Sequence, residues 1–484
     1  MKQKTLYSKI ATLGAASIFG YAVQLFLPII LVRILEEREF VKYRMLFLLV
    51  NTALALAPLY MPQALFYFLP RAVSKHQQVL YISNTIMFLF VAGGIVAIIL
   101  NPWLPIIPVS FFSIASDQGM VPAFILMWVV ASLIDLLPNA CNLIQWQAIL
   151  SVLMTLVRVV LVVGTAWVTN DVGKVFVVLC LFVCLKSFCL LLFIKIYYPK
   201  ISLKFDLCLF KEQIKYALPF GLSSMFYMLK VQSDQWVAAF LFGPTLYTIF
   251  SFGIYVAPLV TLLRNSINNA LLPDMGMYFA RGKIDRVLAD FQYANLMMGL
   301  IVFPVLSILF VAADRIIIFL FTDVYRDASC VMRVYAVGFI AQCLESTVLL
   351  RLVNAGKVVM KLNALLLPFS VLISYVAGNL WSLPGVALGS VLTLYVGEVF
   401  NLWYSARAMR IDFSRIVRWR CWGMLFLSSL VSSFAGSIIA KNIFISPFFD
   451  IVIIAVICIL FYIASLFIGK VLNLISLNDF KCES

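Results

Sequence analysis

Charged side chains interrupt several long apolar segments of this chain, where they are costly to bury. A charge at the centre of a bilayer costs about 2.5 to 3.5 kcal/mol on the insertion scale, so such residues normally face protein or water. Arginine offers a fork of N–H donors that matches phosphate oxygens, and lysine adds a point charge. The basic residues in these segments could therefore bind an anionic group electrostatically. The eight residues are Arg158, Lys186, Lys230, Arg264, Asp135, Asp234, Glu345 and Glu398.

Two of these segments combine charges with other polar residues on one helix face. Tyr227, Lys230 and Asp234 recur at helical spacing. In the next segment Arg264 and Asn268 are one helical turn apart. With polar residues of the first two segments they could line one wet cavity, where cations meet phosphate and the other side chains meet sugar. The candidate substrate-binding residues are Arg264, Lys230, Asp234, Tyr227, Asn268, Gln24 and Gln63.

Each charge also has a structural interpretation. Lys230 and Asp234 are spaced to neutralise each other, and Arg264 could instead pair with Asp234 from the neighbouring helix. Glu345 and Glu398 are candidates for proton or sodium sites, with interhelical hydrogen bonding as the alternative.

The charges in the first half of the chain favour a structural role. We expect Arg158 and Asp135 to form an ion pair between neighbouring helices. Lys186 is expected to extend its amino group towards the membrane surface.

The sequence contains no recognisable catalytic or metal-binding set. Its ten cysteines and one histidine form no C-x-x-C or H-E-x-x-H motif. Cys180 and Cys184 share a helix face, but they lack His or carboxylate neighbours and are interpreted as packing residues. His76 lies in a polar link and is interpreted as solvated. We expect no catalytic residue, no metal and no cofactor, and we expect that the chain is not an enzyme.

The amino-acid composition indicates that these charged residues lie in helices that cross a membrane. Hydrophobic residues make up 64% of the chain and charged residues 12%, against about half and a quarter in soluble domains. A helix needs about 20 mainly apolar residues to cross the hydrocarbon core. The sequence predicts an all-α polytopic membrane protein with about 14 spans, at 10–32, 45–70, 79–101, 120–142, 147–169, 175–194, 214–241, 245–271, 291–311, 334–350, 362–380, 384–406, 421–440 and 448–469.

The distribution of basic residues predicts the orientation of these spans. Of the 36 Lys and Arg, 23 lie at the amino-terminal end, in even-numbered links or after the last span, and 9 lie in odd-numbered links. Cytoplasmic links carry the excess of Lys and Arg, so both termini are predicted to be cytoplasmic. The net charge of +15 is thus mainly a topology signal, and no nucleic-acid partner is expected.

Weak internal similarity divides the chain into repeated parts. Gln63-Ala64-Leu65 at the end of the second span corresponds to Asn269-Ala270-Leu271 at the end of the eighth, and the basic link 195–215 separates the halves. Six spans then match six in the same orientation, as parallel repeats. We expect an N-terminal lobe over 1–200, a C-terminal lobe over 201–410, and two additional helices with a tail over 411–484.

Several short motifs resemble one transporter family in their order and spacing. They include Leu31–Phe40 after the first span, Leu218-Pro219-Phe220 opening the seventh, and Asp234 followed by Gly243–Tyr247 and Ser251. Others are Leu272-Pro273-Asp274, Thr322-Asp323-Val324-Tyr325, Asn354-Ala355-Gly356-Lys357 and Pro384-Gly385-Val386-Ala387. Over about residues 8 to 410 the chain resembles the Wzx-type polysaccharide flippases, in the superfamily that also holds MATE drug exporters and lipid II flippases. It departs from the family at Val41, where Gly is usual, and at Gln235, where Arg is usual.

The resemblance implies two six-helix lobes around a central cavity lined mostly by spans 1, 2, 7 and 8, with alternating access. It implies export of undecaprenyl-diphosphate-linked oligosaccharide repeat units across the bacterial inner membrane, for O-antigen, capsule or exopolysaccharide synthesis. The expected partners are this lipid-linked oligosaccharide, membrane lipid and, as further candidates, other polysaccharide assembly proteins.

Two other functions fit the composition. A cation-coupled MATE-like drug exporter usually has twelve spans and a carboxylate-centred cavity. A membrane enzyme of polysaccharide polymerisation or ligation generally carries a large outer loop with acidic or His/Arg groups, whereas the links here are too short for a soluble domain.

The charge bias makes the orientation testable. A reporter enzyme fused after Arg420 should be located in the cytoplasm, because the link that ends there is even-numbered and basic. A fusion in the link between 312 and 333 should report the opposite side. A periplasmic signal after Arg420 would overturn the assignment of the spans.

Overall fold

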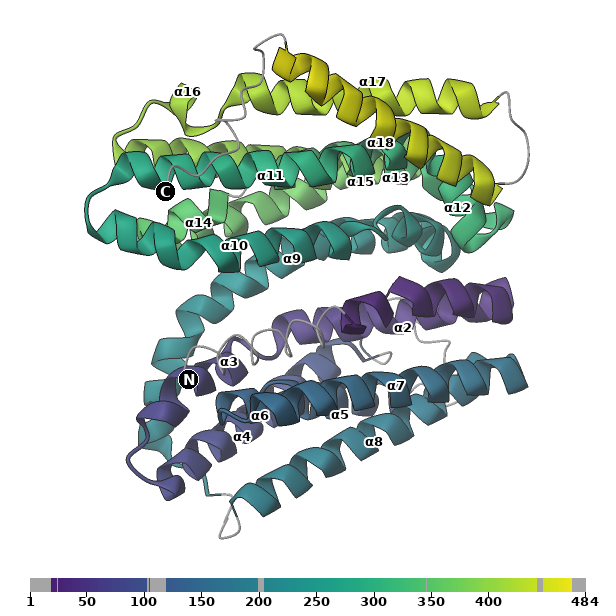
Figure 1. Cartoon of the computed structure of the whole chain (residues 1–484). Helices are drawn as coiled ribbons and strands as arrows, with labels where there is room; N and C mark the ends of the chain where they lie inside the picture. The colour runs from purple at the N-terminus through teal and green to yellow at the C-terminus, as the bar shows by residue number, and fades with distance from the viewer. Residues whose placement is uncertain are drawn as a thin grey trace. The chain divides into compact units, whose positions relative to one another are not determined.

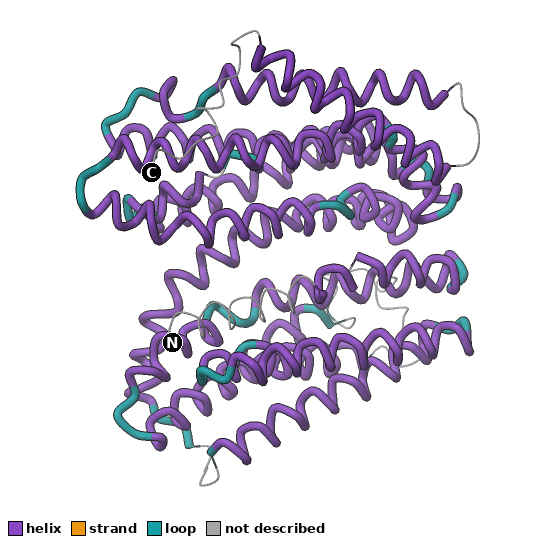
Figure 2. Tube along the Cα trace, viewed as in Figure 1, coloured by secondary structure: helices purple, strands orange, loops and turns teal. Residues whose placement is uncertain are grey.

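The computed structural model describes residues 19–23, 25–101, 104, 119–198, 204–344, 346–441 and 447–471. Every regular element in these ranges is a helix (Figures 1 and 2). The chain divides into two compact units, Met1–Gln232 and Ser233–Ser484, and the division falls within the long helix α9 (Leu207–Gly253). The predicted limits of the lobes at 200 and 410 stay a prediction.

Unit 1 is built around a central helix. α5 packs against α2, α4 and α8, and α7 packs against α8. Aromatic rings fill the contact, with the ring centroids of Phe124 and Trp128 5.3 Å apart and those of Phe124 and Phe176 5.2 Å apart. Besides the apolar helix Phe19–Ile34, its elements are α2 (Glu37–Leu56), α3 (Met61–Phe68), η1 (Leu69–Arg71), α4 (Lys75–Ile99), α5 (Met120–Ala131), η3 (Ser132–Asp135), α6 (Leu137–Ala140), α7 (Ile144–Thr169) and α8 (Val172–Tyr197).

A sharp break separates α2 from α3, which together correspond to the second predicted span. The two helices are bent by 44°. Pro58 has no N–H to continue the helical pattern, and Leu59 and Tyr60 both take a positive φ, at 40° and 65°. Gly221 of α9 approaches the break so closely that a Cβ there would stand 2.3 Å from the carbonyl oxygen of Leu59. The broken span and α9 are thus packed backbone to backbone.

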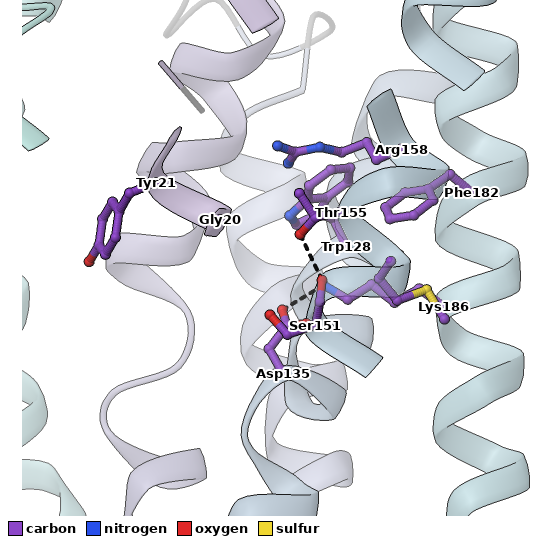
Figure 3. A pocket seen from close by; sticks show the side chains of 10 residues that line it. Gly20, Tyr21, Trp128, Asp135, Ser151, Thr155, Arg158, Phe182 and Lys186 are labelled. Atoms are coloured by element: carbon purple, nitrogen blue, oxygen red, sulfur yellow. Dashed lines mark hydrogen bonds and ion pairs between the residues drawn. The ribbon is translucent and has the colours of Figure 1, made fainter. Parts of the chain in front are cut away.

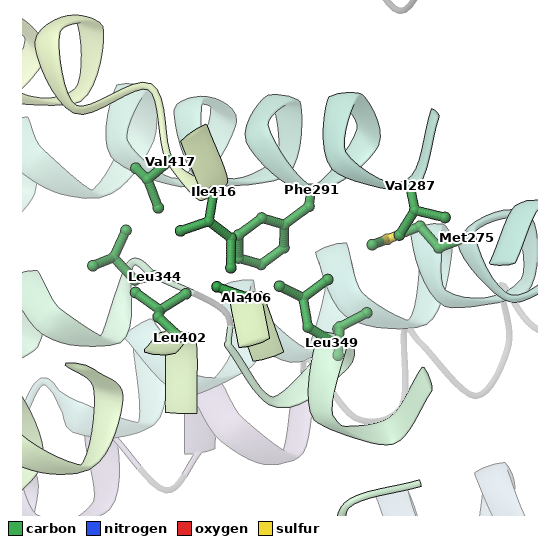
Figure 4. Packing of buried hydrophobic residues seen from close by; sticks show 10 residues of the cluster. Met275, Val287, Phe291, Leu344, Leu349, Leu402, Ala406, Ile416 and Val417 are labelled. Carbon is green, nitrogen blue, oxygen red and sulfur yellow. The ribbon is translucent and has the colours of Figure 1, made fainter. Parts of the chain in front are cut away.

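Unit 2 has its own apolar core. Phe291 of α11, Leu402 of α15, and Ile416 and Val417 at the end of α16 are buried together (Figure 4). α11 is central, because it packs against α10, α13 and α17. The elements are α10 (Ala257–Ala280), α11 (Ile284–Val311), α12 (Ala313–Phe321), η4 (Asp323–Tyr325), α13 (Ala328–Gln342), α14 (Ser346–Leu352), α15 (Gly356–Met409), α16 (Phe413–Ile416), α17 (Trp419–Lys441) and α18 (Pro447–Val471).

A polar cluster ties the short helix α12 to α13. Asp314 accepts a hydrogen bond from the Ser329 hydroxyl at 2.5 Å and forms an ion pair with Arg333. Partial burial opposes ionisation of Asp314, but the hydrogen bonds and the positive charge of Arg333 prevail and hold its pKa below the usual range. The predicted link between the ninth and tenth spans is therefore a folded element.

Two helices are too long to be single spans. α9 has 47 residues and α15 has 54, about 70 and 80 Å at 1.5 Å per residue. α9 is interrupted at Gly243, whose φ of 79° suits a residue without a Cβ. α15 reverses at Trp381 and Ser382. α15 therefore contains two predicted spans, 362–380 and 384–406. α9 contains the seventh predicted span and only the start of the eighth, which continues in α10.

The reversal in α15 brings its two halves into direct backbone contact. A Cβ at Gly385 would stand 2.0 Å from the carbonyl oxygen of Ala377, and one at Gly389 would stand 2.4 Å from the backbone nitrogen of Ser374. The Ser374 hydroxyl donates to the carbonyl of Val386 at 2.9 Å, which holds the halves together. The predicted link 380–384 is a tight helical hairpin.

The structure confirms an all-α polytopic membrane protein. In the described ranges nine helices are long and apolar enough to cross a membrane, or ten if α2 and α3 form one broken span. Every predicted span from the second onward is helical over most of its length. The total of 14 spans stays a prediction.

The α15 hairpin predicts a steric effect of substitution. Gly385→Ala should destabilise the folded protein by about 1 to 3 kcal/mol, because the added methyl group overlaps the backbone of Ala377. Gly94→Ala in α4 is the matched control, since a Cβ there meets nothing within 4 Å. Thermal unfolding in detergent should show a lower midpoint only for the first variant. Equal midpoints would contradict the close approach.

Candidate functional site

A buried ion pair lies among α10, α14 and α15 in unit 2. Nη2 of Arg264 is 3.3 Å from Oε1 of Glu398, and the two side chains are 11% and 10% exposed. Nη2 also donates to the Thr347 hydroxyl at 3.4 Å. The Ser346 hydroxyl donates to the other oxygen of Glu398. The carboxylate is thus neutralised on one oxygen and hydrogen-bonded on the other.

This arrangement can exchange one anion for another. An arginine in a low-dielectric site needs a counter-charge, and Glu398 supplies it in this structure. Phosphate oxygens match the fork of guanidinium donors as carboxylate oxygens do. An anionic ligand that replaces Glu398 keeps Arg264 compensated, and the released carboxylate must then take up a proton, because it stays buried with only the Ser346 hydroxyl on its other oxygen.

Asp234 has partners of its own and does not pair with Arg264. It is buried in α9 and accepts hydrogen bonds from the Tyr335 hydroxyl of α13 and from the backbone N–H of Gln235 at 2.7 Å. The predicted pairing of Arg264 with Asp234 is wrong. Tyr335 was missed because a tyrosine in an apolar helix carries no sequence signal that distinguishes a ligand of a carboxylate from a packing residue.

The other described candidates lie in unit 1. The amino group of Lys230 is 5.5 Å from the ring centroid of Tyr227, which is 42% exposed. Gln63 of α3 has a buried Oε1 that accepts no hydrogen bond from the described residues. The Thr52 hydroxyl of α2 donates to Gln232 of α9 at 3.1 Å. The second and seventh predicted spans are therefore in contact at this point.

The side chains of two predicted substrate-binding residues lie outside the described part of the structure. Gln24 lies outside the described residues, and Asn268 lies in α10 but its side chain is outside the described set. The cavity predicted between the lobes stays a prediction.

A second charged cluster lies within unit 1 (Figure 3). Lys186 of α8 forms an ion pair with Asp135 at 2.6 Å, and Lys186 is 8% exposed. The predicted pair of Arg158 with Asp135 is therefore wrong, and so is the expected extension of Lys186 to the membrane surface. Sequence spacing could not show which basic residue faces Asp135, because that depends on how α7 and α8 rotate against η3.

The described residues contain no group of three or more His, Cys, Asp or Glu that could hold a metal ion. The polar sites are built from single carboxylates with basic or hydroxyl partners. Their geometry suits recognition of charge.

The family model described as "Polysaccharide biosynthesis protein" matches residues 6–279, more than half of the chain. The chain belongs to this family. Membership confirms the predicted resemblance to polysaccharide flippases. Among curated proteins, none matches the chain significantly.

Solved structures of membrane transporters have the same fold. The lipid II flippase MurJ in an inward closed conformation superimposes with a TM-score of 0.70 at 15% identity, over 95% of this chain and 98% of that chain. A MATE transporter of Vibrio cholerae gives 0.56 at 10% identity, over 85% and 98%. An outward-facing multidrug resistance MATE family transporter of the MOP superfamily gives 0.54 at 14% identity, over 83% and 95%. This chain therefore shares its fold with these transporters, over 83% to 95% of its length.

The buried ion pair predicts non-additive effects on stability. Arg264→Met or Glu398→Met alone should lower the free energy of unfolding by about 3 to 5 kcal/mol, because each leaves one buried charge without its partner. The double variant should recover much of this loss, since neither charge remains. Thermal unfolding of the three variants in detergent measures the coupling. Simple additivity would show that the two groups do not interact.

Proposed function

We propose that this protein is a flippase that translocates undecaprenyl-diphosphate-linked oligosaccharide repeat units across the bacterial plasma membrane. Its product would supply the synthesis of a surface polysaccharide such as O-antigen, capsule or exopolysaccharide. The observation that carries the proposal is that a member of the polysaccharide biosynthesis protein family has the fold of a lipid II flippase over 95% of its chain.

The charges inside the membrane supply the chemistry for the head group. In the proposed mechanism Arg264 of unit 2 binds the diphosphate after exchange with Glu398, and Lys230 of unit 1 is a further cation on the substrate path. Tyr227, Gln63 and Asn268 are proposed partners for the sugars, because amide, hydroxyl and aromatic groups are the usual ligands of sugar hydroxyls and ring faces. Electrostatic attraction is stronger in such a low-dielectric site than in water.

Transport by this mechanism makes and breaks no covalent bond. We therefore propose a carrier and not an enzyme, working by alternating access of the two units. The substrate enters from the cytoplasmic leaflet and leaves to the outer leaflet. Cytoplasmic termini in an inner membrane and contacts with other polysaccharide assembly proteins belong to the same proposal.

The similarity to MATE transporters supports a second candidate, a cation-coupled drug exporter. Those structures cover 83–85% of this chain, whereas the lipid II flippase covers 95%. The carboxylate of Glu398 is also held by an arginine, whereas a drug exporter of this kind usually has a cavity centred on a carboxylate. An exporter therefore fits less well.

Deletion of the coding gene tests the proposal directly. We expect surface polysaccharide to be lost and complete lipid-linked repeat units to accumulate in the cytoplasmic leaflet, measured by leaflet-specific labelling and mass spectrometry of the lipid-linked glycans. Normal polysaccharide with altered drug sensitivity would favour the exporter. Complete units in the outer leaflet that stay unpolymerised would point to a polymerase or ligase.

Arg264 should be needed for transport independently of its structural pair. Arg264→Ala/Glu398→Gln should insert normally but lower diphosphate binding about 10- to 100-fold, the loss expected for a hydrogen bond to a charged group. Arg264→Lys is the control that keeps the charge and should retain part of the activity. The measurements are export of the glycan in the deletion strain and the amount of protein in the membrane. Normal export by the double variant would exclude Arg264 from the substrate site.

A further inference from the structure

A cavity lies inside unit 1, apart from the proposed diphosphate site. Its volume is about 320 Å³, and it is lined by residues of the first helix, α5, η3, α7 and α8 (Figure 3). Ligand sites in proteins run from about 300 to 1,000 Å³, so this one suits a single ring-sized group. The polar residues that matter are Tyr21, Asp135, Ser151, Thr155, Arg158 and Lys186.

The charges around the cavity do not cancel. Lys186 is 2.6 Å from Asp135, which leaves that pair neutral. Arg158 lines the cavity, and its buried Nε makes no hydrogen bond with the described residues. No carboxylate in the described ranges forms an ion pair with Arg158. The cavity therefore carries an excess positive charge, and an anion is the ligand that would neutralise it.

The remaining lining suits a polyhydroxylated ring. The Thr155 hydroxyl donates to the backbone carbonyl of Ser151 at 2.7 Å, and its oxygen is still able to accept a hydrogen bond. Trp128 is 8% exposed and lines the cavity with the small part of its ring that its aromatic neighbours leave uncovered, beside the Lys186 amino group 6.0 Å from the ring centroid. Figure 3 shows Thr155 and Trp128 below the guanidinium of Arg158. A sugar ring with one negative group could therefore place its charge on Arg158, a hydroxyl group on Thr155 and its ring against Trp128.

We propose that this cavity binds an acidic sugar, with its carboxylate or phosphate on Arg158 and its ring against Trp128. The proposal rests on the proposed function, and it names a class of cargo: repeat units that contain a negatively charged sugar residue. Arg158 is then a specificity-determining residue, separate from the residues that bind the diphosphate. Its buried Nε without a partner is explained as a donor that the sugar acid satisfies.

Binding of glucuronate to the purified full-length protein tests the site. Phosphatidylcholine nanodiscs avoid both sugar detergents and anionic lipid, and saturation-transfer NMR detects weak ligands. Wild-type protein should bind glucuronate saturably and glucose at least tenfold more weakly. Arg158→Gln should weaken glucuronate binding about 10- to 100-fold, and Asp135→Asn should strengthen it, because Lys186 then loses its counter-charge.

Lys195→Gln is the matched control, since it removes one positive charge from the exposed last turn of the same helix α8. It should leave binding unchanged. Three outcomes would overturn the proposal: no saturable binding by wild-type protein, equal binding of glucose and glucuronate, or unchanged glucuronate binding in Arg158→Gln. Displacement of glucuronate by added phosphatidylglycerol at equal concentration would assign the cavity to a lipid head group instead.

Export assays separate this proposal from the proposed function. In a deletion strain, Arg158→Gln should reduce export of a glycan with an acidic sugar at least tenfold and leave a neutral glycan unaffected. If the deletion itself does not stop export, the flippase function fails while glucuronate binding still stands. If the deletion stops export but Arg158→Gln binds glucuronate normally, only the cavity proposal fails.

Discussion

Charge cannot stay uncompensated inside lipid, and much of this structure follows from that constraint. Two charges are neutralised within their own unit: Asp135 by Lys186 in unit 1, and Arg264 by Glu398 in unit 2. Arg158 is an exception, because it forms no ion pair with a carboxylate of the described residues. Asp234 is satisfied by the Tyr335 hydroxyl within unit 2. Breaking such a pair costs several kcal/mol, because the remaining ion stays buried.

The same constraint separates structural charges from functional ones. A pair such as Lys186 and Asp135 is satisfied and has little reason to react with a ligand. Arg264 is held by a carboxylate that a phosphate can replace, and Arg158 lines a cavity with a buried donor that the described chain leaves without a partner. An anionic ligand gains binding energy at a cation that has no ion-pair partner, or at one whose partner it can replace. The partners of each buried charge therefore decide whether it can bind a ligand.

The sequence predicted the membrane helices well because hydrocarbon imposes a length and a polarity on each of them. It even placed the two halves of α15 correctly, on either side of Trp381 and Ser382. It failed for the ion pairs, since the partner of Asp135 depends on the rotation of α7 and α8 about their axes. Arg158 was predicted to pair with Asp135 and Lys186 to extend to the membrane surface, whereas Lys186 forms the pair. Tyr335 was missed for a related reason: its role depends on a contact between distant helices, and its neighbours in sequence are apolar.

The hairpin within α15 also bears on how the protein enters the membrane. Its two halves meet backbone to backbone at Gly385 and Gly389 and are joined by almost no loop. A connection this short leaves no room for one half to wait in the lipid while the other is still outside the membrane. The close contact and the short connection favour insertion of the two spans together, as one hairpin. Biogenesis of this part of the chain is then a concerted step in which the glycines act before transport begins.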